Sequence, residues 1–447
     1  MSSVPAQHGT EFWGWTSSPD GRGTWDILIS CLVTTFLCCW TAVYPNVPAI
    51  TDGRWNQLLE KIHLTNLGLL GPEFLLGVAM GQRESARSSV KQFSATHPEW
   101  TLSHAFLADM GGLVLAASDL KHPIPINAKQ VFYLVQHGYI EFPNVSIVDI
   151  KDRNKADGLA RLITVGQAVW FVANSIARAV QGIHITTIEL TTLSFVVVTL
   201  ATSYLWFHKP ADVSSPIILR CKVPISEILQ KASDPTARTK YYRTPLDFIS
   251  RDEYVFSLLW QYYNDILRRF HIPPIFSRPV TAEPWDRIPS AVFLRHSNLL
   301  TEALCGVVIL TYGAIFMTAW NAPFPTEAER TVWRAASMYG VVFCVFGGAY
   351  TWAWHVWFFA RWRRARPLLV PDEPRGRRAF ADRLRNLSRD NDPHLDMPLA
   401  LLLPVTVFCV VHVVCRVFIF VEDIIGLRAL PPSAYETVSW ARFMPHI

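Results

Sequence analysis

Apolar stretches of about 20 residues recur along this 447-residue chain, and strongly polar segments separate them. An α-helix needs about 20 such residues to cross roughly 30 Å of hydrocarbon. Because these runs are unbroken, they exclude a membrane β-barrel, whose strands alternate in polarity. Half of the residues are hydrophobic and only 17% are charged. The sequence therefore predicts an all-α, polytopic membrane helical bundle. Its six expected spans are Asp26 to Val43, Leu159 to Gln181, Thr187 to Phe207, Leu299 to Trp320, Val332 to Ala360 and Leu399 to Phe420.

Two further stretches are too short or too broken to be predicted as full spans. Residues 62–80 contain Gly71-Pro72-Glu73 in the middle of an apolar run, and residues 104–117 contain Asp109 and Gly111-Gly112. Backbone can be broken at membrane depth where protein or a water-filled cavity receives it, so both stretches fit re-entrant half-helices. Amphipathic helices on the membrane surface explain them equally well.

The basic residues predict the orientation of the bundle. Residues 45–158, 208–298 and 361–398 contain 33 of the 41 lysines and arginines. Cytoplasmic loops are enriched in these residues, so the three segments are expected in the cytosol. Six crossings then place both termini on the non-cytosolic side. The polar stretch before the first span fits an uncleaved anchor, and the endoplasmic reticulum or another endomembrane is the expected location.

The expected organisation follows from these spans. The run of ten arginines between residues 361 and 389 is explained by topology and by attraction to anionic lipid. No signature of nucleic-acid binding accompanies the basic charge. The expected parts are a non-cytosolic tail (1–25), a membrane region (26–207) with a cytosolic or interfacial insert (45–158), a cytosolic helical segment (208–298), a membrane hairpin (299–360), a basic cytosolic loop (361–398), and the last span with its non-cytosolic tail (399–447).

Polar side chains in the second span form one stripe. Gln167, Asn174, Arg178 and Gln181 lie within about 60° of arc on a regular helix, so they are expected to face the bundle interior. Glu189 begins the next span across a five-residue turn, within reach of Arg178. The pair either fastens the helical hairpin or forms the wall of a substrate cavity.

The last span repeats this pattern. Arg416 and Asp423 follow His412 by four and eleven residues, again on one face. A histidine in a membrane helix can accept and donate protons when a charged neighbour tunes it, although helix-to-helix hydrogen bonding explains it as well. Glu73, His104 and Asp109 add polar groups to the two broken stretches. His104 and Asp109 are about 140° apart on a regular helix, so they cannot act as one surface there.

Specific catalytic signatures are missing from the sequence. It contains no HExxH, GxSxG, Walker or GxGxxG motif, and no carboxylate pair spaced to hold a magnesium diphosphate. The eight cysteines show neither CxxC nor zinc spacing. The sequence therefore predicts neither a metal site nor a cofactor.

Several short motifs of the chain resemble those of a known protein family. They include Arg22-Gly23-Thr24-Trp25-Asp26, Trp100-Thr101-Leu102-Ser103-His104, Trp206-Phe207-His208-Lys209-Pro210 and Leu427-Arg428-Ala429-Leu430-Pro431. With these the chain resembles a family of functionally unassigned fungal multi-pass membrane proteins, some associated with specialised-metabolism genes. The resemblance implies a role near lipophilic metabolites, including terpenoids. The chain departs from that family at His104-Ala105-Phe106-Leu107, where relatives commonly read His-Gly-Phe-Phe.

Two functional hypotheses follow. In the first, the chain is a membrane-embedded enzyme that isomerises or cyclises a lipophilic metabolite by proton transfer. Its expected catalytic residues are Glu189, His412 and Asp109. In the second, it is a non-catalytic carrier or a scaffold that gathers soluble pathway enzymes at the membrane. Membrane lipids and a lipophilic small molecule are the expected partners, and nucleic acid is not. The residues expected to line the substrate cavity are Gln167, Asn174, Arg178, Arg416, Glu73 and His104.

Overall fold

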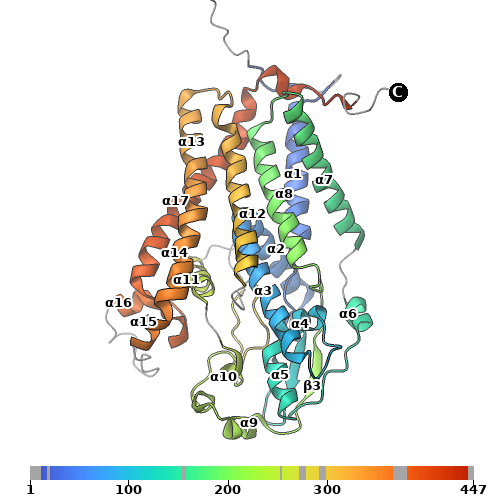
Figure 1. Cartoon of the computed structure of the whole chain (residues 1–447), viewed down its shortest axis with the longest axis vertical. Helices are drawn as coiled ribbons and strands as arrows, with labels where there is room; N and C mark the ends of the chain where they lie inside the picture. Colours follow the sequence, from blue (N-terminus) through green and yellow to red (C-terminus); the bar gives the residue numbers. More distant parts are fainter. Residues whose placement is uncertain are drawn as a thin grey trace, which may run out of the picture.

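The computed structural model describes residues 12–17, 21–153, 158–251, 254–270, 278–290, 298–365 and 380–440. The chain is mostly helical, with 66% of its residues in helices and 3% in strands. Long, nearly parallel helices form a bundle, and shorter elements gather at one of its ends (Figure 1). This end carries the three basic segments and is called the basic end below. The opposite end, where the first and the last described residues lie, is called the terminal end.

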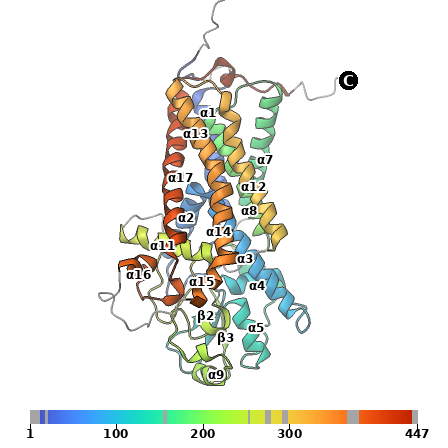
Figure 2. The same cartoon turned by 60° about the vertical axis from the view of Figure 1, so that its left-hand side comes forward.

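Among the described residues, five helical stretches are long and apolar enough to cross a membrane, which makes this a multi-pass membrane protein. One of them, Glu327–Ala365, is a single rod in which two π-helical stretches separate the α-helical parts α13 (Glu327–Val342), α14 (Gly348–Ala353) and α15 (Ala360–Ala365). Figures 1 and 2 show α13 beside α17 along the bundle. The other four contain α1 (Thr24–Thr41), α8 (Thr187–Leu205), α12 (Leu299–Met317) and α17 (Leu399–Ile425).

These five stretches correspond to five of the six expected spans. The remaining expected span, Leu159 to Gln181, forms helix α7 (Gly158–Val180), which lies beside α1 and α8. Gln167 on α7 donates a hydrogen bond of 3.1 Å to the Thr34 hydroxyl on α1. By length and composition α7 is not among the five, so the count of six stays a prediction.

Both ends of the described chain lie at the terminal end. Trp13 and Leu430 exchange two backbone hydrogen bonds of 2.8 and 2.9 Å, which join the two terminal segments in an antiparallel bridge. Residues 432–435, near the end of the described chain, lie at the same end of the bundle as the start of α1 (Figures 1 and 2). The side of the membrane on which each terminal segment lies stays a prediction of the distribution of basic residues.

The first broken stretch bends sharply. Helix α2 (Arg54–Leu70) ends at Gly71, and Pro72 begins helix α3 (Pro72–Phe93) at an angle of 118° to it. Proline suits the first position of a helix because it lacks the N–H that would otherwise be unpaired there. Just after the bend, Glu73 contacts His412, which lies midway along α17. The bend therefore reaches the middle of the bundle, which favours a re-entrant segment over a helix on the membrane surface.

The second broken stretch differs from both expectations, because it leads into a small sheet at the basic end. After helix α4 (Leu102–Asp109), the chain turns at Gly111, whose φ is +81°, and enters strand β1 (Leu113–Ala116). Strand β2 (Ile124–Pro125) pairs with β1 antiparallel, and strand β3 (Ile217–Arg220) pairs with it parallel. The fold is therefore not purely helical, and residues 104–117 are not a half-helix.

Short helices also gather at the basic end (Figure 1). One hydrophobic core continues from the bundle into this region, with Val198 and Tyr312 in the bundle and Phe106 and Leu115 at the basic end. The expected insert 45–158 and segment 208–298 thus belong to one body. The short helices are α5 (Ala128–Gln136), α6 (Ile147–Arg153), α9 (Ile225–Lys231), α10 (Asp247–Ser250), α11 (Val255–Arg269) and α16 (Phe380–Arg385).

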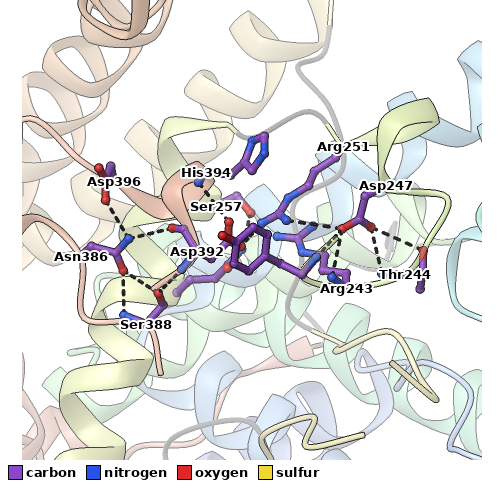
Figure 3. A network of polar contacts seen from close by, with 12 residues as sticks. Arg243, Thr244, Asp247, Arg251, Ser257, Asn386, Ser388, Asp392, His394 and Asp396 are labelled. Carbon is purple, nitrogen blue, oxygen red and sulfur yellow. Dashed lines mark hydrogen bonds and ion pairs between the residues drawn. The ribbon is translucent and has the colours of Figure 1, made fainter. Parts of the chain in front are cut away.

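A buried polar network fastens the loop before α17 to this body (Figure 3). Arg251 forms ion pairs with Asp247, at 3.4 Å, and with Asp392. The Asn386 amide donates hydrogen bonds of 2.7 Å to the Asp392 carbonyl and to the Asp396 carboxylate. Because these charges are buried and paired, removing one partner would leave the other uncompensated. Residues 366–379 of the expected basic loop lie outside the described residues.

Candidate functional site

A narrow cavity lies inside the bundle between α12, α13 and α17. Its volume is about 20 Å³, the room of one or two water molecules. Most of its wall is apolar, but polar side chains reach it from each of the three helices. The lining includes Tyr312 and Phe316 of α12, Ser337 and Gly340 of α13, and His412 and Arg416 of α17.

His412 and Glu73 form a buried pair beside the cavity. Nε2 of His412 lies 3.2 Å from Oε1 of Glu73, and both residues are at most 8% exposed. The Phe343 ring stacks on the His412 ring at a centroid distance of 4.0 Å. Phe343 begins the π-helical turn Phe343–Gly347, and such turns interrupt helices frequently at functional sites. His412 faces the cavity, whereas Glu73 is not among the residues that line it.

Arg416 lies one helical turn beyond His412 on the same face of α17. Its guanidinium carbon is 5.0 to 5.3 Å from the ring centroids of Phe195, Tyr312, Phe316 and Phe420. Within the described part of the chain, neither Nε nor Nη2 of Arg416 has a hydrogen-bond partner. Aromatic faces stabilise a cation but accept few hydrogen bonds, so the donors at the guanidinium edge remain available.

Ionisable groups are costly in a membrane bundle, and they mark functional sites there. The neighbouring side chains Val413, Val414 and Val417 are exposed on the other face of α17, whereas His412 and Arg416 are buried. The spacing of the last span thus predicts correctly which face is inside. Asp423 continues this buried face toward the terminal end.

The Arg178–Glu189 pair lies in a different place, near the terminal end. Arg178 Nε is 3.9 Å from Glu189 Oε1, and Arg22 forms an ion pair with the same carboxylate. Arg178 also donates hydrogen bonds of 2.8 Å to the Glu436 carbonyl and 2.7 Å to the His184 carbonyl. These contacts connect the hairpin between α7 and α8 to both terminal segments. They agree with the fastening alternative, and neither side chain lines the cavity.

The other members of the α7 stripe also face neighbouring segments. Gln167 bonds to α1, and Gln181 exchanges hydrogen bonds of 2.9 and 3.0 Å with the backbone of Ser439. Asn174 is half-buried. None of these three lines the cavity between α12, α13 and α17.

His104 and Asp109 lie at the basic end and do not meet. Nδ1 of His104 is 2.8 Å from the Thr101 hydroxyl, and its Nε2 is 2.7 Å from the Val145 carbonyl. Asp109 accepts a hydrogen bond of 3.0 Å from the Ala128 amide. Both residues fix the packing of α4, and the catalytic roles predicted for Asp109 and Glu189 remain predictions.

A buried lysine lies near Asp109. Lys209 follows α8 and donates hydrogen bonds of 2.8 Å to the Tyr44 carbonyl, 3.2 Å to Asn46 and 2.9 Å to Gln82. Burial lowers the pKa of Lys209 to about 7, although the Asp109 charge opposes this shift. Burial likewise raises the pKa of Asp109 to about 6, against the hydrogen bond from Ala128. In the sequence, Lys209 stands out only as part of the motif Trp206-Phe207-His208-Lys209-Pro210.

Sequence reasoning also missed the residues that complete the cavity. Tyr312, Phe316 and Ser337 are a tyrosine, a phenylalanine and a serine in apolar helices, where such residues are common. A helical-wheel reading of α13 gives one signal, because Ser337 shares the buried face with Trp333 and Ala336. In the described ranges no group of three or more histidine, cysteine, aspartate or glutamate side chains is placed to hold a metal ion.

The bundle and its buried polar cluster define a multi-pass membrane protein with a polar site between its spans. The chain belongs to a family of unknown function (DUF8562), whose profile matches residues 1–230 and 288–447. No curated protein and no solved structure matches it. Membership of this family supplies no activity, so the function rests on the chemistry of the cavity.

Proposed function

We propose that this protein is a membrane-embedded enzyme that transfers a proton within a lipophilic small molecule bound at the cavity. The observation that carries the proposal is the His412–Glu73 pair, held at 3.2 Å beside a cavity inside an apolar bundle. A histidine paired with a carboxylate can both take and return a proton. The resemblance noted in the sequence suggests a substrate from specialised metabolism, including terpenoids.

The two residues have different roles in this proposal. His412 lines the cavity and is the catalytic residue, because only its ring faces the space where a substrate would lie. Glu73 acts through His412 and is a positioning residue, which orients the ring and stabilises its protonated form. In an isomerisation, His412 removes a proton from one carbon and returns it to another. Such a step needs no oxidant, reductant or second substrate.

The proposal is tested by comparing metabolite extracts from hosts that express the wild type, His412→Ala, Glu73→Gln or Glu73→Asp at equal protein levels. Loss of the catalytic histidine should reduce product at least about 100-fold. Glu73→Gln should reduce it less and shift the pH dependence of the rate, and Glu73→Asp should restore part of it. Arg334→Gln serves as the comparison, because Arg334 lies on α13 without lining the cavity and its loss should leave the product per molecule unchanged. Unchanged products in His412→Ala would refute the assignment.

A carrier is the second candidate function. A proton-binding pair midway along a span is also found in proton-coupled transporters, where it links substrate movement to the proton gradient. Proteoliposomes distinguish the two functions. Uptake of a lipophilic substrate that depends on a pH gradient and on His412, with no chemical change in the substrate, would favour the carrier. A scaffold would instead retain its soluble partners in the His412→Ala variant.

A further inference from the structure

We propose that the cavity binds the carboxylate headgroup of an amphiphilic acid, and that Arg416 is the residue that recognises it. The inference rests on the proposed function for the choice of site, and it names the class of ligand. Three side chains of the cavity wall supply the donors: Arg416, Tyr312 and Ser337. Each of them is at most 5% exposed, so water from outside the bundle does not reach them freely.

The first argument is the unused hydrogen-bonding capacity of these side chains. In the described part of the chain, Nε and Nη2 of Arg416 and Oγ of Ser337 have no hydrogen-bond partner. A buried donor left without an acceptor costs about 1 to 3 kcal/mol, and more when it is charged. The Tyr312 hydroxyl lies on the ring whose centroid is 5.0 Å from the guanidinium carbon. An acceptor placed between these groups would satisfy several donors at once.

The second argument is charge. His412 and Glu73 together are neutral when they share one proton, wherever that proton lies. Among the described residues Arg416 forms no ion pair within 4 Å, and the carboxylates near enough to act on its charge are Glu73, which is already paired with His412, and Asp423. Asp423 is seven residues further along α17, which is about 10 Å along the helix axis. A positive charge this deeply buried favours an anionic ligand over a neutral one.

The third argument is size and shape. A cavity of about 20 Å³ admits a group of about the size of one or two waters, which suits a carboxylate and not a phosphate or a sugar. The four aromatic rings surround the guanidinium of Arg416, and its planar edge with Nε and Nη2 matches the two oxygens of a carboxylate.

The apolar tail of such an acid would leave the cavity toward the lipid. Gly340 lines the cavity, and a Cβ atom built on it would meet no atom within 4 Å, so free space lies beside this residue and we place the opening there. Met338, two residues earlier on α13, is half-exposed at 51% on the outside of the bundle. An acid dissolved in the bilayer could therefore place its headgroup at Arg416 while its chain stays among lipid tails.

Equilibrium binding of radiolabelled dodecanoate tests the inference, with the full-length protein in phosphatidylcholine nanodiscs and empty discs subtracted. We expect saturable binding, and unlabelled dodecan-1-ol should compete at least about tenfold less well than dodecanoate, because a charge-assisted bidentate pair is worth at least about 1.4 kcal/mol. Arg416→Gln should weaken binding by about tenfold or more. Gly340→Leu, which fills the opening, should weaken it while Arg416 stays in place. Arg334→Gln, on the same rod but not lining the cavity, is the control and should bind as the wild type does.

Several outcomes would overturn the inference. Equal competition by dodecanol would mean that the cavity binds a neutral acceptor, and equal competition by phosphatidic acid would mean that it binds a lipid phosphate. Absence of saturable dodecanoate binding by the wild type would also overturn the inference. If Arg416→Gln does not fold, the wild-type competition and Gly340→Leu still decide. Dodecanoate binding that depends on Arg416, together with unchanged metabolites in His412→Ala, would refute the proposed enzyme and leave the ligand class intact.

Discussion

Lys209 shows how a single buried charge shapes the basic end. The side chain is 2% exposed, and its ammonium also lies 4.7 Å from the centre of the Trp206 ring. Three acceptors from two different segments converge on it. The lysine thus connects the end of α8 to α3 and to the loop after α1, close to where the bundle meets the sheet.

Replacing Lys209 by methionine should destabilise the protein by about 2 to 4 kcal/mol at pH 7, because three buried acceptors lose their donor. The difference in stability between the wild type and Lys209→Met should grow above pH 7. Folding lowers the pKa of Lys209 from 10.5 to about 7, so between these values the unfolded chain binds more protons. Stability of the wild type therefore rises with pH between about 7 and 10.5, and below about 7 this group no longer changes it, because Lys209 is then protonated in both states. The methionine variant lacks this pH-dependent contribution to its stability. Thermal unfolding in detergent at pH 7 and pH 9 measures both effects.

Lys222→Met is the matched control for this experiment. The Lys222 side chain is 53% exposed, and its ion pair with Glu141, at 3.4 Å, is on the surface. Surface pairs contribute about 0 to 1 kcal/mol. A gap between the wild type and Lys209→Met that stays constant from pH 7 to pH 9 would contradict the lowered pKa.

The sequence predicts the site well where one helix carries it and poorly where distant helices meet. His412 and Arg416 share a face of one helix, and their spacing alone shows that both are buried together. Glu73 could be recognised as unusual but not as the partner of His412. That contact depends on the 118° bend and on how α3 packs against the bundle, neither of which periodicity encodes.

At the scale of elements, the bend at Gly71 determines where Glu73 lies. A Cβ atom on Gly71 would lie 2.5 Å from the Phe74 ring, which packs near Trp260 at a centroid distance of 6.1 Å. The glycine therefore allows α2 and α3 to meet at this angle. A larger residue would have to displace the Phe74 ring and, with it, the first turn of α3.

Gly71→Ala should accordingly destabilise the protein by about 1 to 3 kcal/mol, the usual cost of overpacking. Gly166→Ala is the control, because a Cβ at that position in α7 meets nothing within 4 Å. There the change should stabilise the helix by up to about 1 kcal/mol, since alanine favours helix more than glycine does. Unfolding temperatures of the two variants should therefore move in opposite directions. Equal shifts would mean that the bend tolerates a side chain.

The strands are the elements that could not be predicted from the sequence. Leu113–Ala116 is a run of four apolar residues, which periodicity cannot distinguish from part of a buried helix. Its parallel partner, Ile217–Arg220, lies far along the chain, beyond two helices of the bundle. Only the tertiary fold brings the two segments together, so neither could be predicted as a strand from local sequence.

At the scale of the whole molecule, the distribution of basic residues predicts a topology that an experiment can test. The three basic segments lie at one end of the bundle, and both terminal segments lie at the other (Figure 1). With α7 as a sixth crossing and α2–α3 as a re-entrant pair, the chain crosses the membrane an even number of times. The positive-inside rule then predicts a cytosolic basic end.

Glycosylation sites test this orientation directly. Acceptor sites added at the N-terminus and at the C-terminus should both be glycosylated in the endoplasmic reticulum, and a site within residues 380–396 should not. Each site is introduced alone, in a separate variant, so that its modification reports on an otherwise unchanged protein. Modification of only one terminus would indicate an odd number of crossings, as expected if α7 stays on one side or if α2 and α3 together cross. Modification of the site within residues 380–396 would reverse the orientation that the basic residues predict.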